Sequence, residues 1–341
     1  MPDRFRPRVL VLSHYDREVI AAPIERLAAK AQVVDACLGR LLTREEILER
    51  IPGVHATIAS DEGYSAEILD RAADLVLIAR DGTGYDAIDL EAATERGILV
   101  TRAHVLHHAT ANTTIGLMVA LVRKIALADR GVRENRWNDR SVWLAPDLTG
   151  MTLGIIGFGQ VGREVAKRAL AMGMRILACN RSDVSTAATQ IGATIVSMDE
   201  VLRNSDVVSL HMRHSGKTSN MFDADIFARM KKGAYFVNTA RGGLVDEAAL
   251  AEALSCGHLA GAALDVFARE PVELDHPLLA FESVLCTPHF AGDTTTSMSQ
   301  AVESAVQQVL DCFAGRKPEH LINPQAWDKA RIHDLKRDGK Q

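Results

Sequence analysis

The sequence predicts an α/β protein made of two doubly wound domains, each with a parallel sheet covered by helices. Short apolar runs alternate with longer amphipathic runs from Arg8 to about Val100, and a second series of this kind begins at Thr152. Such alternation is typical of parallel strands joined by crossover helices. The length of 341 residues exceeds what one hydrophobic core usually holds, so we expect two domains.

The expected elements follow from these two series. In the first series we expect strands at 9–12, 56–59, 75–79 and 98–101, and helices near 18–31, 44–51, 65–72 and 88–96. A long helix from Ala109 to about Leu127 comes next, and an irregular segment with Trp137 and Trp143 leads to Pro146. The second series has expected strands at 153–156, 175–178, 194–196, 207–210, 234–237, 262–264 and 284–286. After a final helix at 294–313, the polar tail 328–341 is expected to be loose.

The second series opens with a glycine-rich motif. The apolar run Leu153–Ile156 leads into G-x-G-x-x-G, and a helix-favouring segment follows. A strand, a glycine turn and a helix in this order form the dinucleotide-binding fingerprint of a Rossmann domain. The free amides and positive dipole of the helix N-terminus would bind the phosphates. The turn predicted to bind the cofactor comprises Gly157, Phe158, Gly159, Gln160, Val161 and Gly162.

The residues after the next strand indicate which dinucleotide binds. An NAD site usually has an acidic residue about 20 positions beyond the glycines, which accepts hydrogen bonds from the ribose hydroxyls. Here Asn180, Arg181 and Ser182 stand in that place. A carboxylate would repel a 2′-phosphate, whereas an Arg and a Ser can bind one. We therefore expect NADP to be preferred, with NAD also possible.

Three later strands are each followed by a residue whose side chain can take part in catalysis. Arg241 follows the strand at 234–237, Glu270 follows the strand at 262–264, and His289 follows the strand at 284–286. In an open α/β sheet, ligands bind beyond the carboxyl ends of the strands. An Arg, a His and an orienting carboxylate at consecutive strand ends form a catalytic set.

Composition excludes several classes of function. The net charge of −5 and a pI near 6.2 give no basis for a nucleic-acid partner. Five scattered cysteines without C-x-x-C spacing favour a reducing cytosol over a disulfide scaffold or a zinc site. No signal-peptide pattern or membrane-length apolar run is present, so we expect a soluble, cytoplasmic protein without a membrane partner.

These motifs together resemble the D-isomer-specific 2-hydroxyacid dehydrogenase family, particularly its glyoxylate/hydroxypyruvate reductase-like members. The glycine turn, the block 238–246, the segment 265–271 and the segment 287–292 stand in the family's order and spacing. The resemblance runs from Leu75 to about Pro324. It implies two Rossmann-like or flavodoxin-like domains, with residues 1–103 and 289–341 forming a discontinuous substrate domain around a cofactor domain at 104–288.

The resemblance also implies roles for individual residues. Arg241, Glu270 and His289 would be catalytic, and Asp265 would face the nicotinamide carboxamide. The loop 79–86 would bind the substrate carboxylate through the backbone amides of Thr83 and Gly84. The substrate-binding set is then Arg80, Thr83, Gly84 and Arg241. Beyond the glycine turn, the cofactor-binding set is Asn180, Arg181, Ser182, His211, Thr239, Ala240, Arg241, Asp265 and His289.

The chain also departs from the family's pattern in places. Arg213 stands where many members have Pro after the His of the strand at 207–210, and it would assist Arg181 or lie on the surface. The hinge Arg102-Ala103-His104 lacks the usual Asn and Pro. His104, His107 and His108 lie close together in the sequence, but no acidic ligands cluster with them, so we expect no metal site.

The expected function is hydride transfer between NAD(P)H and a small 2-oxoacid or D-2-hydroxyacid, acting on the CH–OH group. Arg241 would bind the substrate, His289 would exchange the proton, and Glu270 would orient His289. Two alternatives share the scaffold: a dinucleotide-sensing corepressor and a phosphoglycerate dehydrogenase. Acidic Asp61 and Glu62 stand where the latter carries phosphate-binding Arg. The helix at 109–127 and the segment 137–146 resemble the family's dimer-forming arm, so we expect a homodimer.

Overall fold

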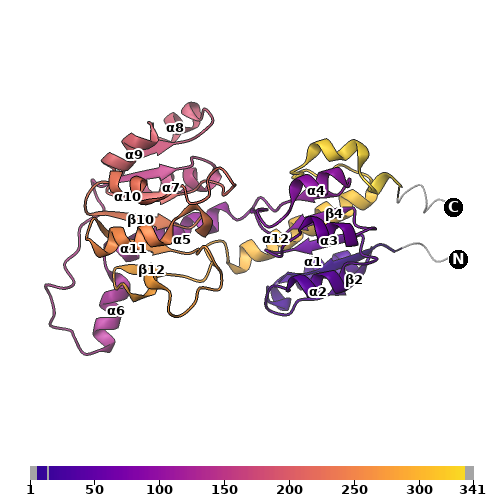
Figure 1. The fold of residues 1–341 in the computed structure, drawn as a ribbon, viewed down its shortest axis with the longest axis horizontal. Coiled ribbons are helices and arrows are strands. Elements are labelled where there is room, and N and C mark those ends of the chain that lie inside the picture. Colours follow the sequence, from indigo (N-terminus) through magenta and orange to yellow (C-terminus); the bar gives the residue numbers. More distant parts are fainter. Residues whose placement is uncertain (1–5, 14, 335–341) are drawn as a thin grey trace. The chain divides into compact units, whose positions relative to one another are not determined.

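The computed structural model describes residues 6–13 and 15–334 of the chain. They form two units: the first comprises the chain up to Leu106 and from Asp293 onward, and the second comprises His107–Gly292. Figure 1 shows both the indigo start and the yellow end of the chain in the first unit. The boundaries expected from the sequence were 103/104 and 288/289.

The first unit contains one five-stranded parallel sheet with the strand order β2-β1-β3-β4-β5. Its central strands β3 and β4 are buried along their whole length, which explains their nearly continuous apolar sequences. The strands are β1 (Arg8–Val11), β2 (Gln32–Asp35), β3 (Ala56–Ala59), β4 (Leu77–Arg80) and β5 (Leu99–Thr101).

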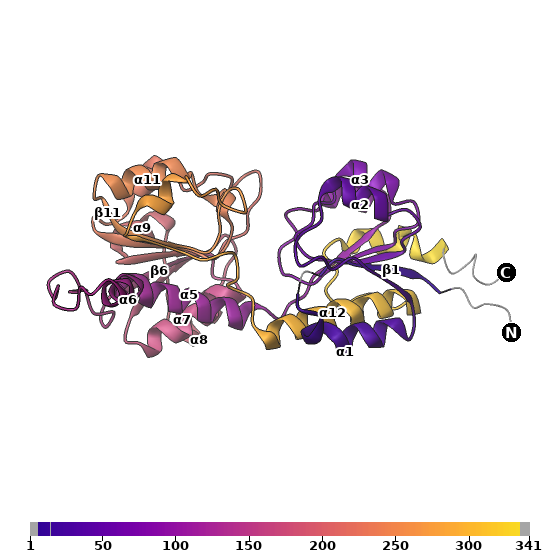
Figure 2. The same cartoon turned by 90° about the horizontal axis from the view of Figure 1, so that it is seen from below.

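Helices cover both faces of this sheet (Figure 2). α1 (Arg17–Ala28) and α12 (Thr295–Ala314) pack together on one face and share a core with Val9, Val11 and Ile58. The other face is covered by α2 (Arg44–Arg50), α3 (Ala66–Arg71) and α4 (Leu90–Glu95). Helix α12 comes from the far end of the chain, so the first unit is discontinuous in sequence.

The second unit contains a seven-stranded parallel sheet with the order β12-β11-β10-β9-β6-β7-β8. The strand order reverses between β6 and β9, and an open α/β sheet binds its ligands at the carboxyl ends of strands at such a switch point. The strands are β6 (Thr152–Ile156), β7 (Arg175–Cys179), β8 (Thr194–Ile195), β9 (Val207–Leu210), β10 (Ala234–Asn238), β11 (Leu259–Leu264) and β12 (Val284–Cys286).

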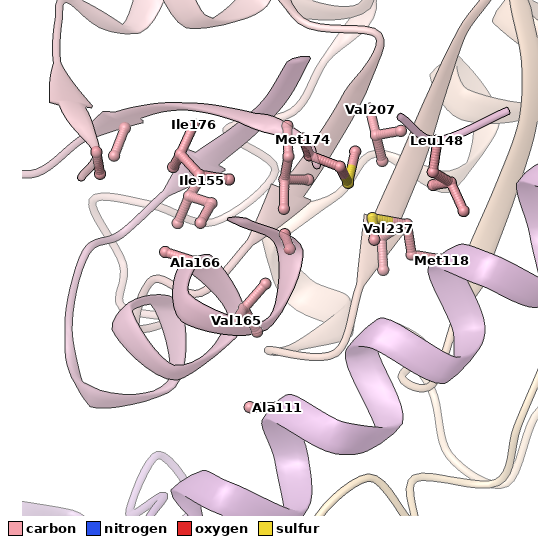
Figure 3. Packing of buried hydrophobic residues seen from close by; sticks show 14 of the residues in the cluster. Ala111, Met118, Leu148, Ile155, Val165, Ala166, Met174, Ile176, Val207 and Val237 are labelled. Atoms are coloured by element: carbon pink, nitrogen blue, oxygen red, sulfur yellow. The ribbon is translucent and has the colours of Figure 1, made fainter. Parts of the chain in front are cut away.

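Helices lie on both faces of the second sheet as well (Figure 2). α5 (His107–Val122), α7 (Gln160–Ala171) and α8 (Ser185–Ile191) cover one face. α9 (Met198–Asn204), α10 (Ala224–Arg229) and α11 (Glu247–Ser255) cover the other. Figure 3 shows the first of these cores, where Met118 of α5 and Val165 of α7 face Ile155, Val207 and Val237 of the strands. The predicted fold class, two parallel-sheet α/β domains, is confirmed.

Three local expectations were wrong. The expected helix 109–127 is broken, because Lys124 has a left-handed backbone (φ 54°) and a second helix, α6 (Ile125–Arg133), begins after it. Strand β2 was missed, since it is a short edge strand with no fully buried residue. The tail does not become loose at Asp328: Ile332 is buried in the core of the first unit. The rest of the expected tail, 335–341, lies outside the described residues.

Among the described residues, no single helix has the length and apolar composition of a membrane span, although α5 and α6, bent by 61° at their junction, pass that test as a pair.

Candidate active site

The glycine turn follows β6 directly and needs glycine at two positions for steric reasons. Gly157 has φ +99°, and a Cβ on it would lie 2.5 Å from the carbonyl oxygen of His211. A Cβ on Gly162 would collide with the carbonyl oxygen of Gly157, so this glycine lets α7 pack against the turn. A Cβ on Gly159 would meet no atom within 4 Å. The backbone at Gly159 therefore borders open space at the N-terminus of α7, where a pyrophosphate fits.

Asn180 connects the glycine turn to the segment that follows β7. Its Oδ1 accepts a hydrogen bond from the backbone N–H of Phe158 at 3.0 Å. Its Nδ2 donates to the carbonyl oxygen of Ser182 at 3.0 Å and to Ser182 Oγ at 2.9 Å. Because Ser182 Oγ accepts this bond, its own hydrogen is available to another acceptor. Arg181 and Ser182 are both exposed. This segment can therefore present a hydroxyl and a guanidinium to a phosphate.

His211 stands at the end of β9, beside the glycine turn. Burial lowers the pKa of its imidazole to about 3, so the ring is neutral at physiological pH. Its Nε2 and Ser209 Oγ lie 2.9 Å apart. The next residues, Met212 and Arg213, leave the strand, and Arg213 is exposed. A neutral, hydrogen-bonded His211 supports the strand end without placing a charge beside the turn.

Arg241 lies in the turn after β10. Its Nη1 donates to the carbonyl oxygen of Ala240 at 2.7 Å, which ties the guanidinium to its own turn. The preceding Thr239 is buried, and its Oγ1 lies 2.8 Å from Thr114 Oγ1 of α5. The three residues predicted here, Thr239, Ala240 and Arg241, thus lie at the carboxyl end of the strand next to β9.

Asp265, the residue after β11, holds the segment that carries His289. The carboxylate is buried and accepts hydrogen bonds from Thr287 Oγ1 (2.6 Å) and from the backbone N–H groups of Phe290 (3.1 Å) and Ala291 (2.9 Å). The N–H of His289 donates to the carbonyl oxygen of Asp265 at 2.8 Å. These bonds hold His289 in a left-handed backbone conformation with φ +52°.

His289 and Glu270 form a close pair of titratable groups at this edge of the sheet. His289 Nδ1 lies 2.6 Å from Glu270 Oε2, and both side chains are about one-third exposed, at 35%. Glu270 Oε1 accepts from the backbone N–H of Phe267 at 2.9 Å, which fixes the carboxylate. A carboxylate at Nδ1 favours the tautomer with hydrogen on Nδ1, so Nε2 is the atom that exchanges a proton.

The topology gathers these groups at one edge. The glycine turn, Asn180, His211, Arg241, Asp265 and His289 follow β6, β7, β9, β10, β11 and β12 respectively, and all these strands are parallel neighbours. Glu270 reaches the same edge through its contact with His289. The edge therefore combines a phosphate-binding turn, a fixed guanidinium and an imidazole–carboxylate pair, which suits hydride transfer coupled to proton transfer.

The predicted substrate-binding residues lie in the first unit: Arg80 ends β4, and Thr83 and Gly84 lie in the loop that follows. Arg80 is buried, and its guanidinium donates to the carbonyl oxygen of Gly84 (2.8 Å) and to Asp61 Oδ1 (2.5 Å). Thr83 Oγ1 donates to the carbonyl oxygen of Ala103 at 3.3 Å. The side chain of Arg80 thus shapes the backbone of the loop whose amides were predicted to bind a carboxylate.

Acidic groups surround this loop. Asp81 is buried and accepts from Ser60 Oγ at 2.8 Å. Glu62 is also buried, accepts from the N–H of Ser60 at 2.9 Å, and has no hydrogen-bond partner for its Oε1. Burial, reinforced by the charge of Asp81, raises the pKa of Glu62 to about 7. These acids follow β3 and β4 at the carboxyl edge of the first sheet.

Three structural partners were missed from the sequence: Asn238, Thr287 and Asp61. Asn238 and Thr287 bond the turns of Arg241 and His289, and Asp61 pairs with Arg80. The only signal in the sequence was a polar residue at each strand end.

Of the histidines near the hinge, His108 pairs with Glu164 (3.1 Å) and His104 packs on His320. Within the described ranges, no cluster of three or more His, Cys, Asp or Glu could hold a metal ion.

Comparison with known proteins identifies the family. Residues 115–291 match the model of the "D-isomer specific 2-hydroxyacid dehydrogenase, NAD binding domain". The chain belongs to the D-isomer-specific 2-hydroxyacid dehydrogenase family. The motifs 157–162, 238–246 and 265–271 lie inside the matched residues, and the segment 287–292 lies inside them up to residue 291.

Relatives of this chain differ in their named activities. The chain is 39% identical to D-3-phosphoglycerate dehydrogenase of Archaeoglobus fulgidus over 83% of this chain and 54% of the relative. It is 37% identical to glyoxylate reductase of Korarchaeum cryptofilum over 83% of this chain and 87% of the relative. The chain therefore spans about half the length of the phosphoglycerate dehydrogenase.

A solved structure also resembles this chain. It is the NADPH-dependent glyoxylate/hydroxypyruvate reductase of Sinorhizobium meliloti with NADP and malonate, at 28% identity and a TM-score of 0.81. The match covers 94% of this chain and 98% of that one.

Proposed function

We propose that this dehydrogenase is an NADPH-using reductase of small 2-oxoacids such as glyoxylate or hydroxypyruvate. The observation that carries the proposal is the 2.6 Å contact between His289 Nδ1 and Glu270 Oε2, at the sheet edge that also carries Arg241 and the glycine turn. An imidazole held by a carboxylate suits a reaction in which a carbonyl oxygen must gain a proton. The glyoxylate reductase relative supports the substrate class.

The proposed mechanism assigns one task to each side chain. A bound reduced nicotinamide supplies the hydride. Arg241 binds the substrate carboxylate and carbonyl oxygen and orients the carbonyl carbon. Protonated His289 donates a proton from Nε2 to the carbonyl oxygen, and neutral His289 accepts it in the reverse direction. Glu270 holds the Nδ1–H and stabilises the imidazolium.

The acids of the first unit favour an unphosphorylated substrate. Asp61, Glu62 and Asp81 stand at its carboxyl edge, and the guanidinium of Arg80 is bonded to Asp61 and Gly84. A phosphate near these carboxylates would be repelled. The test compares kcat/KM for hydroxypyruvate with that for 3-phosphohydroxypyruvate. A higher value for the phosphorylated compound would favour the phosphoglycerate dehydrogenase alternative, which the relative from Archaeoglobus fulgidus represents.

We propose NADPH as the preferred cofactor because Asn180 brings no negative charge and orients Ser182. Its Nδ2 bonds Ser182 Oγ at 2.9 Å, so the hydroxyl can donate to a 2′-phosphate next to Arg181. A hydrogen bond to a charged group contributes about 1.5–3 kcal/mol, which predicts a preference for NADPH of about 10- to 150-fold. Asn180→Asp with Arg181→Ala should reverse the order of kcat/KM. Equal values for NADPH and NADH in the unaltered protein would refute this role.

The corepressor alternative uses the same scaffold without requiring turnover. Sustained oxidation of NADPH by a 2-oxoacid distinguishes the reductase from a dinucleotide sensor. If the protein binds NADPH but does not oxidise it with any 2-oxoacid, that result would favour the dinucleotide sensor.

We further propose a cytoplasmic homodimer. The arm formed by α6 and residues 134–146 exposes Ile125, Val132, Trp137 and Leu144. Trp143 instead packs against Gly131 of α6, where a Cβ would collide with its ring. Exposed apolar side chains on one arm suit an interface with a second copy. None of the five cysteines forms a disulfide, which supports a reducing compartment.

A further inference from the structure

A buried amide holds the turn that carries Arg241. Asn238 is the last residue of β10 and is fully buried. Its Oδ1 accepts from the N–H of Ala240 at 3.0 Å, and its Nδ2 donates to the carbonyl oxygen of Arg241 at 2.9 Å. An amide supplies an acceptor and a donor at once, which a carboxylate cannot do. The side chain therefore bonds both ends of the Ala240–Arg241 peptide segment.

The same turn is packed tightly from outside. A Cβ on Gly242 would collide with the backbone of Phe267 and Ala268, and a Cβ on Gly243 would lie 2.8 Å from His214 Nε2. The N–H of Phe267 also donates to Glu270 Oε1 at 2.9 Å. The segment on which the Arg241 turn rests is thus the segment that fixes Glu270, the partner of His289.

We propose that Asn238 is a positioning residue, whose amide sets the place of the Arg241 guanidinium relative to the Glu270–His289 pair. The guanidinium follows its backbone because Nη1 bonds the carbonyl oxygen of Ala240, within the turn that Asn238 holds. A shift of the turn would therefore move the group that binds the substrate carboxylate. The inference rests on the proposed function, in which Arg241 has that task.

The first experiment replaces the donor of Asn238 without changing its size. Asn238→Asp keeps an acceptor for Ala240 but places a second oxygen against the carbonyl oxygen of Arg241. We expect KM for the best 2-oxoacid and the Kd of oxalate, a non-reducible carboxylate mimic, to rise about tenfold or more. The Kd of NADPH, measured by its fluorescence, should rise clearly less than the Kd of oxalate, because the glycine turn and Asn180 are unchanged.

Asn204→Asp is the matched control. Asn204 Nδ2 donates to the carbonyl oxygen of Glu200 at 2.8 Å, and it lies at the C-terminal end of α9, before β9 begins. The change removes the same kind of bond away from the carboxyl edge, and we expect all three constants to be unaltered. Ordinary KM and oxalate affinity in Asn238→Asp would overturn the inference. An equal loss of NADPH affinity would also overturn it, since the effect would then be a general loss of structure.

A second experiment tests the inference even if Asn238→Asp does not fold. Oxalate affinity is measured for Asn238→Ala, Arg241→Ala and the double variant, all with NADPH bound. If Asn238 acts through Arg241, the Asn238 change should cost nothing further once Arg241 is gone. A full additional loss in the double variant would contradict the inference. Failure of the unaltered protein with every 2-oxoacid would instead remove the proposed function.

Discussion

His289 has a backbone conformation that few residues other than glycine adopt. Its φ of +52° costs about 1–2 kcal/mol for an L-residue. Four hydrogen bonds between Asp265 and residues 287–291 offset this cost and direct the ring toward Glu270. Loss of the imidazole should therefore affect chemistry more than folding, because the strained backbone is held by Asp265.

The first prediction concerns this imidazole. His289→Ala should lower kcat by about 10²–10⁴-fold, since the variant lacks the Nε2 atom that exchanges the proton with the substrate. The Kd of NADPH should change little, because the glycine turn and Asn180 are not altered. Steady-state kinetics and fluorescence titration measure the two effects. Unchanged turnover would mean that His289 does not carry the proton.

A second prediction concerns Glu62, whose pKa burial raises to about 7 from a usual 4.5. The folded protein holds this proton more tightly than the unfolded chain. The contribution of this proton to the free energy of unfolding is therefore fully present below about pH 4.5 and is lost as the pH rises through about 7. Glu62→Gln should raise the free energy of unfolding by up to about 3 kcal/mol at pH 8, with little gain near pH 4.5.

Urea unfolding at the two pH values checks this prediction. The Gln side chain retains an acceptor for the N–H of Ser60, so the local hydrogen bond survives. Glu91→Gln, at an exposed position of α4, is the control and should show no such gain. A gain of the same size at both pH values would show that the charge of Glu62 is not the cause.

Sequence reasoning reaches some site residues and not others for a physical reason. Arg241 and His289 could be predicted, because each follows an apolar run that predicts a strand end. Asn238 could not, since a polar residue at a strand end does not reveal which groups it bonds. The burial of Arg80 was equally hidden, because its partner Asp61 comes from another strand end.

At the scale of elements, two glycines of one turn should respond differently to the same change. Gly162→Ala should destabilise the protein, because its Cβ would collide with the carbonyl oxygen of Gly157. Gly159→Ala should fold normally, because its Cβ meets no atom within 4 Å. It should nevertheless weaken NADPH binding by tenfold or more, about 1.4 kcal/mol, by blocking the approach of the pyrophosphate.

Thermal unfolding and NADPH titration of both variants test this pair. Normal NADPH affinity in Gly159→Ala would show that the pyrophosphate does not lie against this residue.

The break between α5 and α6 could not be predicted from the sequence. Lys124 adopts φ 54° without a Gly or Pro nearby, so the apolar pattern continued across the break.

At the scale of the whole molecule, the fold class followed from the sequence because short and long apolar runs alternate in both series and the glycine turn opens the second one. The return of α12 to the first unit did not follow from periodicity, since a periodic pattern does not say which core a helix joins. Only the resemblance to the family implied it.

The proposed dimer is a prediction at this scale. Trp137 and Leu144 are 62% and 75% exposed on the arm that follows α6. Sedimentation velocity at micromolar concentration should give a dimer, and Val132→Glu with Leu144→Glu should shift it toward monomer by placing charges in an apolar interface. Leu274→Glu, at another exposed position, is the control. A monomeric unaltered protein would contradict the proposal.

The most direct test of the account is NADPH oxidation by the purified protein with a panel of 2-oxoacids that includes glyoxylate and hydroxypyruvate. The account predicts sustained turnover with at least one of them, faster with NADPH than with NADH, and its loss in His289→Ala. Absence of turnover with every 2-oxoacid, in a protein that still binds NADPH, would contradict it.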